Sequence, residues 1–199
     1  MNKSLGSKIK QLVKKNKGSI KLNLGCGTDY KEGWVNVDNN SDDNIEKLDL
    51  NWDLRNPLPH KDNSVDFIFN EHFFEHLTVE EGQVCMKDFM RVLKPGGVMR
   101  IAMPDLEEAV AFYMDKNWKQ KAFIKNFGLD FVETRAELLN MNFRNWGHKW
   151  LYDWEELERR LKQAGYTNIK RCKRGKSDHA ELSKLEIRNE SNLIAEVIK

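Results

Sequence analysis

The sequence has few of the residues that mark secreted, metal-stapled or membrane-spanning proteins. It contains three cysteines, Cys26, Cys85 and Cys172, and they form no CxxC pair. A disulfide framework, a cysteine zinc site and a dithiol redox motif are therefore excluded. No apolar run approaches the ~20 residues of a membrane span, and the N-terminus lacks the apolar core of a signal peptide. We therefore expect a cytoplasmic protein with no membrane partner.

The sequence also lacks a strong net charge. Its 33 Lys and Arg residues nearly balance 31 Asp and Glu residues, which gives a net charge of +2. Nothing in this balance indicates a nucleic-acid partner, and nothing indicates an oligomeric state. Residues 1–19 are locally basic, with six lysines and no acid, and their apolar residues recur at helical spacing. We expect a short basic helix there with a solvated face.

The order of apolar runs and turn residues predicts one α/β domain over residues 1–199. Runs typical of strands occupy residues 20–24, 34–37, 49–54, 65–69, 98–102, 166–172 and 192–198. Helical patterns occupy residues 78–93, 106–113 and 153–164, and the turn at 94–97 ends the first of these helices. Strands that alternate with helices indicate a mostly parallel sheet with right-handed crossovers and helices on both faces.

Chemically informative residues follow the predicted strands. Gly25 and Gly27 follow the first strand, Asp38 the second, Asp53 the third, and the triplet Asn70-Glu71-His72 the fourth. In an open parallel sheet, ligands bind at the carboxyl ends of the strands. Glycines let the backbone approach a ligand, and a carboxylate at the next strand can accept both ribose hydroxyls. This pattern predicts a nucleoside site.

Three segments in order carry a more specific resemblance: LNLGCGTDYKEGWVNVD, then DLRNPLPHKDNSVDFIFNEHFFEHL, then FMRVLKPGGVMRIAMPD. Together they resemble the class I S-adenosylmethionine-dependent methyltransferases over residues 20–105. The tail, YDWEELERRLKQAGYTNIKRC with SNLIAEVIK, is similar to the last helix and strands of small family members among sugar and cell-surface biosynthesis enzymes. The resemblance implies a Rossmann-like seven-stranded sheet with S-adenosylmethionine as cofactor.

The resemblance also implies a role for each strand-end residue. Gly25, Cys26 and Gly27 would cradle the methionine part, and Asp38 the ribose. Asp53 with the Leu54 backbone would hold the adenine, and the carbonyl of Asn70 would meet the methionine amine. The neighbouring residues Leu24, Asn39 and Glu71 complete the cofactor site that the resemblance implies.

Two features depart from the broad family pattern. Asn23 stands where an acid often precedes the glycine loop, and the first crossover between Gly27 and Trp34 is too short for a helix. The same shortness argues against a dinucleotide cofactor, because its pyrophosphate needs a helix N-terminus and an acid ~20 residues further on. S-Adenosylmethionine has no phosphate. Its cationic sulfonium would be favoured by a rim formed by Asp38, Asp53 and Glu71.

The segment His72-Phe73-Phe74-Glu75-His76 also matches the HxxEH pattern of inverted zinc peptidases. There, two histidines one helical turn apart bind zinc and the glutamate activates water. No third ligand is evident in the sequence, so we expect no metal site and keep a zinc hydrolase as an alternative.

Methyl transfer needs a base only when the acceptor is a hydroxyl. His72 is the first candidate, with Glu71 and His76 behind it, because a histidine that titrates near neutral pH can take such a proton. The alternative is that the three side chains only line the site. A second alternative function is a module that binds S-adenosylmethionine or its product without catalysis.

Residues 118–152 form an aromatic-rich helical insertion after the fifth strand, where this family commonly builds an acceptor lid. The spacing of Phe123, Phe127 and Phe131 predicts core packing. Asn145, His148 and Lys149 are the expected polar contacts of a lid, and His179 could join them. By resemblance, the acceptor is a small molecule or glycan precursor, methylated on oxygen or nitrogen, rather than DNA or RNA.

Overall fold

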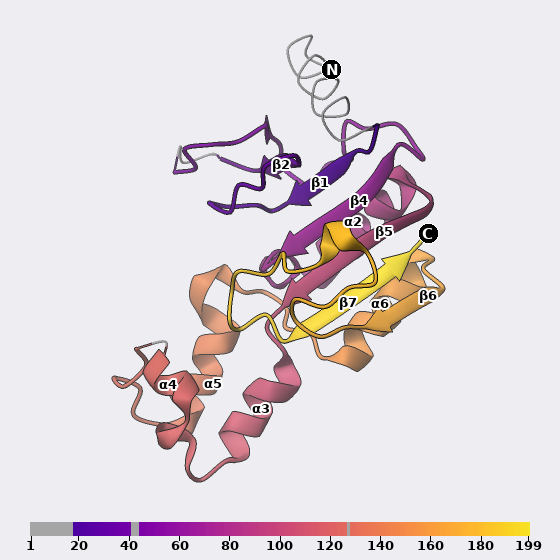
Figure 1. The fold of residues 1–199 in the computed structure, drawn as a ribbon. Helices are drawn as coiled ribbons and strands as arrows, with labels where there is room; N and C mark the ends of the chain where they lie inside the picture. Colours follow the sequence, from indigo (N-terminus) through magenta and orange to yellow (C-terminus); the bar gives the residue numbers. More distant parts are fainter. Residues whose placement is uncertain (1–17, 41–43, 127) are drawn as a thin grey trace.

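A computed structural model describes residues 18–40, 44–126 and 128–199 (Figure 1). The predicted basic helix over 1–19 lies outside the described residues, except for its last two, which are not helical. The strands are β1 Lys21–Leu24, β2 Val35–Asp38, β3 Leu50–Asn51, β4 Val65–Glu71, β5 Leu93–Met103, β6 Asn168–Arg171 and β7 Leu193–Ile198. The α-helices are α2 Val79–Val92, α3 Leu106–Met114, α4 Ala122–Asn126, α5 Arg135–Arg144 and α6 Trp154–Ala164. Short 3₁₀ helices are η1 Phe74–His76, η2 Trp118–Gln120, η3 Asn145–Gly147 and η4 Ala180–Leu182.

All seven strands form one sheet in the order β3-β2-β1-β4-β5-β7-β6. Strands β1 to β5 pair in parallel with one another, and β7 is antiparallel to both β5 and β6. The strand order reverses at β1, because β2 lies on one side of it and β4 on the other. The predicted mostly parallel, Rossmann-like sheet is confirmed.

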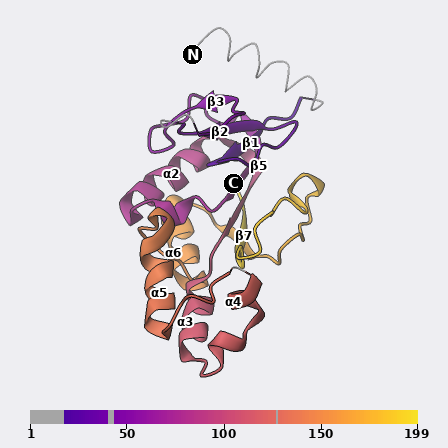
Figure 2. The same cartoon turned by 90° about the vertical axis from the view of Figure 1, so that its left-hand side faces the viewer.

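The two faces of the sheet are covered differently (Figure 2). Helices α2 and α6 pack on one face, where Met86, Phe89 and Leu157 join the main hydrophobic core. On the other face, among the described residues, the loop 172–192 with η4 takes the place of a long helix. Leu182 of η4 packs there against Phe69. Helices α3, α4 and α5 lie beyond the carboxyl end of β5 (Figures 1 and 2).

Local sequence signals account for the helix ends. Thr78 caps α2 through the predicted capping box, in which its side chain and that of Glu81 bond each other's backbone N–H. Gly165 closes α6 in a left-handed conformation with φ of 105°, which glycine adopts without steric cost. In the described part, no helix is both long and apolar enough to cross a membrane.

Two local predictions need correction. The turn expected at 94–97 lies inside β5, because Leu93 already pairs with Val65 of β4 before the register shifts. Phe131, which its spacing predicted to pack in a core, is 63% exposed. The insertion instead forms its own small core from Trp118, Ile124, Leu129, Val132 and Leu138.

Candidate functional site

The loop after β1 is held in a tight bend by the strand beside it. The N–H groups of Gly25 and Cys26 both donate to the carbonyl of Val37, at 2.9 and 3.2 Å. Gly25 has a φ of 68°, and a Cβ built there would lie 2.6 Å from the Phe73 ring. Only glycine fits this position, because both the backbone conformation and the close ring exclude a side chain.

Asp38, at the end of β2, fixes the same loop through its carboxylate. Its Oδ2 accepts the N–H of Gly27 at 2.6 Å, and its Oδ1 accepts the N–H of Asn39 at 2.6 Å. Asn23 contributes to the bend as well, since its amide donates to the carbonyl of Asp29 at 2.8 Å and to the Asn36 side chain at 2.9 Å. The side-chain amide of Asn23 therefore holds the bend by donating hydrogen bonds, which a carboxylate at this position could not do.

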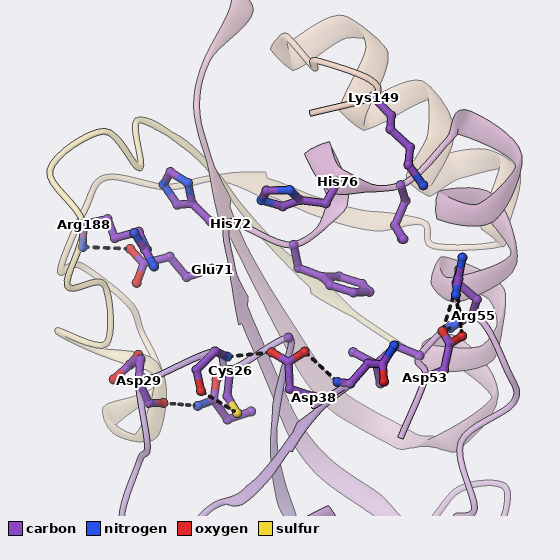
Figure 3. Close-up of a pocket in the computed structure, with 17 residues that line it drawn as sticks. Cys26, Asp29, Asp38, Asp53, Arg55, Glu71, His72, His76, Lys149 and Arg188 are labelled. Atoms are coloured by element: carbon purple, nitrogen blue, oxygen red, sulfur yellow. Dashed lines mark hydrogen bonds and ion pairs between the residues drawn. The ribbon is translucent and has the colours of Figure 1, made fainter. Parts of the chain in front are cut away.

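A cavity of about 340 Å³ opens beside this loop and is called the first cavity (Figure 3). Its size lies in the range of small-molecule sites. The predicted site residues all line it except Leu24 and Asn70; those that line it are Gly25, Cys26, Gly27, Asp38, Asn39, Asp53, Leu54, Glu71, His72 and His76. Leu24 and Asn70 are fully buried behind the wall, and neither side-chain polar atom of Asn70 has a hydrogen-bond partner in the described part.

The acids that were expected to form a negative rim are each engaged. Glu71 accepts the N–H groups of Ile187 and Arg188, both at 3.1 Å (Figure 3). Arg55 makes a bidentate contact with Asp53, and these hydrogen bonds lower the pKa of that carboxyl. Three cations, Arg55, Lys149 and Arg188, line the same cavity, so the rim carries both signs of charge.

The cysteine in the glycine loop is a poor nucleophile. Cys26 is 6% exposed, and burial, with the charge of Asp38 adding to it, raises the pKa of its thiol to about 12. The thiolate, which is the reactive form, is therefore scarce near neutral pH. Cys26 contributes shape and backbone to the cavity.

Beyond β4, the chain places two histidines and a glutamate together. His72 has a left-handed backbone with φ of 53°, and its Nδ1 lies 3.1 Å from Oε1 of Glu75. Glu75 is 1% exposed. His76 packs edge-to-face on His148, with ring centroids 5.1 Å apart, and burial lowers the pKa of His76 below its usual value. Positive φ in a non-glycine residue is costly and is often found at functional sites.

The HxxEH segment does not have the helix that a zinc peptidase needs. Only Phe74–His76 are helical, in a single 3₁₀ turn, and the left-handed His72 lies before it. The two histidines are therefore not presented by one α-helical turn, and the peptidase alternative loses its structural basis.

A second cavity of about 320 Å³ adjoins the first one. Its walls come from the start of α3, from α5 and from η3, and include Phe112, Leu138, Asn142, Trp146 and His148. Three residues line both cavities: His72, His76 and Arg188. The two cavities thus meet at one wall of basic side chains.

The residues that we expected at a lid do not gather in one place. Trp146 and His148 line the second cavity, and Lys149 lines the first. Asn145 lines neither cavity. His179 precedes η4 on the other face of the sheet, where its ring centroid lies 6.1 Å from that of Phe67. Trp118 belongs to the core of the insertion.

Two residues of this region were missed from the sequence. Arg188 reaches both cavities only because the 187–191 loop is bonded to Glu71, more than a hundred positions earlier in the chain. Glu75 was noticed only as part of the HxxEH pattern. Its burial beside three histidines depends on contacts that no local signal encodes.

Comparison with known proteins agrees with this geometry. A family model described as a methyltransferase domain matches residues 24–101, which run from the glycine loop to β5. The demethylmenaquinone methyltransferase of Staphylococcus aureus (strain JH9) is 27% identical over 152 residues. That alignment covers 72% of this chain and 58% of the relative, so the chain spans less than two thirds of the relative's length.

Solved structures support the same fold. A SAM-dependent methyltransferase from Archaeoglobus fulgidus superposes with a TM-score of 0.54 at 20% identity, over 96% of this chain and 90% of the other. A SAM-dependent methyltransferase from Thermotoga maritima gives a TM-score of 0.52 at 16% identity, over 90% and 82%. These structures share the fold of this chain, and with the methyltransferase-domain match over residues 24–101 they support a class I S-adenosylmethionine-dependent methyltransferase.

Proposed function

We propose that this protein transfers the methyl group of S-adenosylmethionine, held in the first cavity, to a small-molecule acceptor held in the second. The observation that carries the proposal is the wall of His72, His76 and Arg188 that both cavities share. Methyl transfer is an in-line displacement at the carbon of the sulfonium. The acceptor atom must therefore reach that carbon from the side opposite to sulfur, and positioning supplies much of the rate enhancement.

Within the first cavity, the proposal assigns each part of the cofactor to one element. The bend of Gly25, Cys26 and Gly27 faces the methionine part, and Asp38 faces the ribose. Asp53 and the Leu54 backbone face the adenine. The engaged state of Asp38 favours this assignment, because a carboxylate that already orders the loop can still accept ribose hydroxyls through its remaining lone pairs.

His72 is the proposed base for a hydroxyl acceptor. Its Nε2 is buried without a hydrogen-bond partner in the described part, while its Nδ1 faces the carboxylate of Glu75. A carboxylate at Nδ1 favours a proton there and leaves Nε2 as an acceptor. Glu71 is less suited to this role, because its oxygens already accept hydrogen bonds from the 187–191 loop. His76 remains as a second side chain on the shared wall.

The second cavity supports a ring-bearing acceptor. Phe112, Leu138 and Trp146 give it apolar walls, and Glu108, Arg188 and Glu190 give it polar ones. We propose that the insertion 118–152 is a lid, since α5 and η3 form one side of this cavity. The S. aureus relative is named for a quinone-type substrate, demethylmenaquinone. Phenolic or quinol rings and sugar precursors are therefore the two acceptor groups to test.

The test combines binding with turnover. Calorimetry with S-adenosylhomocysteine on the full chain should show a single site. Assays with labelled S-adenosylmethionine should then show methyl transfer to a phenolic or sugar compound from a panel. Binding with no transfer to any acceptor would favour a non-catalytic binding module, and failure to bind the nucleoside would refute both functions.

A separate variant tests whether His72 acts as a base. His72→Ala should abolish turnover and leave the affinity for S-adenosylhomocysteine unchanged. His179→Ala, which removes a histidine from the opposite face of the sheet, is the matched control and should keep full activity. An unaltered kcat in His72→Ala would mean that this side chain only lines the site.

A further inference from the structure

The wall between the two cavities holds a group of side chains that methyl transfer alone does not explain. One carboxylate oxygen of Glu75 and one ring nitrogen each of His76 and His148 lie within 4.8 Å of one another. The three residues come from η1 and from the segment after η3, which are 72 positions apart in the sequence. This group differs from the ligand set of the HxxEH pattern, because it contains Glu75 and His148 and does not include His72.

Glu75 is the most unusual member of this group. Its side chain is 1% exposed, and neither carboxylate oxygen accepts a hydrogen bond of good geometry within the described part. Its nearest polar neighbour is Nδ1 of His72, 3.1 Å from Oε1. A buried carboxylate without hydrogen bonds is costly, because it has lost its hydration and gained little in return. A cation beside it would remove this cost.

His148 is oriented as metal-binding histidines commonly are. Nδ1 of His148 lies 2.7 Å from the carbonyl of Asn142, so this nitrogen carries the proton and Nε2 is left free. The His76 ring lies beside Gly147, where a Cβ built on the glycine would be 3.7 Å from Nδ1. Metal-binding histidines usually donate their second N–H to a carbonyl or carboxylate, which fixes both tautomer and ring direction.

The backbone also brings the two segments together firmly. The carbonyl of Glu75 accepts the N–H of Lys149 at 2.7 Å and that of Trp150 at 3.3 Å, so the chain directly after His148 is attached to η1. Trp146, two residues before His148, has a φ of 57°. This conformation turns the chain so that His148 faces His76.

From these contacts we propose that Glu75, His76 and His148 form a binding site for one divalent first-row transition metal ion. Two imidazoles and one carboxylate suit Zn²⁺, Co²⁺ or Fe²⁺ and do not suit Mg²⁺ or Ca²⁺, which prefer all-oxygen ligands. Three protein ligands leave at least one coordination position open. Since His76 and His148 line the second cavity, that position faces the space proposed for the acceptor.

The consequence for catalysis rests on the proposed function, whereas metal binding itself does not. An ion at this wall would hold an oxygen or nitrogen of the acceptor and lower the pKa of a coordinated hydroxyl. It would therefore select acceptors that present a heteroatom at the junction of the two cavities.

Metal binding can be tested without any acceptor. Untagged protein, stripped with a chelator and dialysed, is titrated with Co²⁺ while its visible absorption is recorded, and with Zn²⁺ by calorimetry. One ion should bind per chain. His148→Ala and Glu75→Gln should each weaken binding at least about a hundredfold, and His179→Ala, outside the cluster, should leave it unchanged.

The outcomes separate this inference from the proposed function. S-Adenosylhomocysteine binding, measured on every variant, reports whether the cofactor site and the fold are intact. If the wild type takes up no ion, or if His148→Ala and His179→Ala bind it equally, the metal site is refuted and the methyltransferase proposal is untouched. If S-adenosylhomocysteine fails to bind while Co²⁺ still binds in a manner that depends on His148, the methyltransferase proposal is refuted and the metal site is supported.

Discussion

The hydroxyl of Ser191 donates to Oε1 of Glu71 at 2.6 Å and attaches the loop before β7 to the end of β4. Two backbone N–H groups, from Ile187 and Arg188, donate to the same carboxylate. Glu71 thus holds a whole loop in place, and this loop carries Arg188 to the wall shared by the two cavities.

Replacing this carboxylate should release the loop. Glu71→Gln keeps the size of the side chain but removes its charge and one acceptor oxygen, so a buried donor loses its partner. We expect the free energy of unfolding to fall by about 1–3 kcal/mol. Urea unfolding measures this change. Ser191→Ala, which removes one of the three donors and leaves the charge, should cost about 1 kcal/mol. Equal stability of Glu71→Gln and the wild type would show that the loop is held by other contacts.

Gly25→Ala tests the bend beside Phe73. The new Cβ would lie 2.6 Å from the ring, at a φ of 68° that alanine rarely adopts. We expect loss of S-adenosylhomocysteine binding in calorimetry, because the loop must move away from the Phe73 ring. Gly96→Ala is the matched control, since it has a similar φ of 79° and nothing within 4 Å of the added Cβ. It should reduce stability slightly and keep the affinity. Equal affinities in the two variants would argue against a tight bend.

The features that could be predicted from the sequence are those encoded by close neighbours. The α2 capping box depends on Thr78 and Glu81, three positions apart, and the left-handed end of α6 depends on Gly165 alone. The ends of β1 and β2 were predicted for the same reason, because an apolar run followed by glycine or acid marks each of them. The fourth strand was predicted to end at residue 69, whereas β4 continues through Asn70 and Glu71. Parallel strands then bring Asp38 and Glu71 to the same cavity.

The features that could not be predicted depend on contacts distant in the sequence. Two contacts are examples: Glu71 binds the 187–191 loop, and His148 packs against His76. Each joins segments that are far apart in the sequence, and no sequence pattern indicates that they meet. The left-handed His72 was equally hidden, since few histidines adopt positive φ even though histidine does so more often than most residues. Phe131 was predicted to pack because of its helical spacing, but it is exposed. The spacing was misleading because α5 begins only after Thr134, so Phe131 is not part of that helix.

Asp38 and Asp53 should differ in their effect on cofactor affinity. Asp38 holds two backbone N–H groups of the loops that line the first cavity, whereas Asp53 is already paired with Arg55. Asp38→Asn removes the charge from both bonds, and we expect the affinity for S-adenosylhomocysteine to fall about ten- to a hundredfold. Asp53→Asn should have a smaller effect. Calorimetry measures the affinity of both variants. A larger loss in Asp53→Asn than in Asp38→Asn would show that the ribose does not bind at Asp38.

Arg100 should be the most costly ion-pair residue to replace in the sheet. It lies on β5, is fully buried, and makes ion pairs with Glu186 and Glu196. Its guanidinium also donates to the carbonyls of Lys173 and Lys176, so it attaches the 173–186 segment to the face opposite α2. Arg100→Met leaves two buried carboxylates without their cation, and we expect the free energy of unfolding to fall by about 3–5 kcal/mol.

An exposed arginine provides the control for this last change. Arg159 is paired with Glu156 on α6, and its side chain is 48% exposed. Solvent screens such a pair, so Arg159→Met should change the free energy of unfolding by about 0–1 kcal/mol. Urea unfolding of both variants gives the comparison. If Arg100→Met were as mild as Arg159→Met, the two glutamates would have to find water or other donors, and the 173–186 segment would not depend on Arg100 for its position.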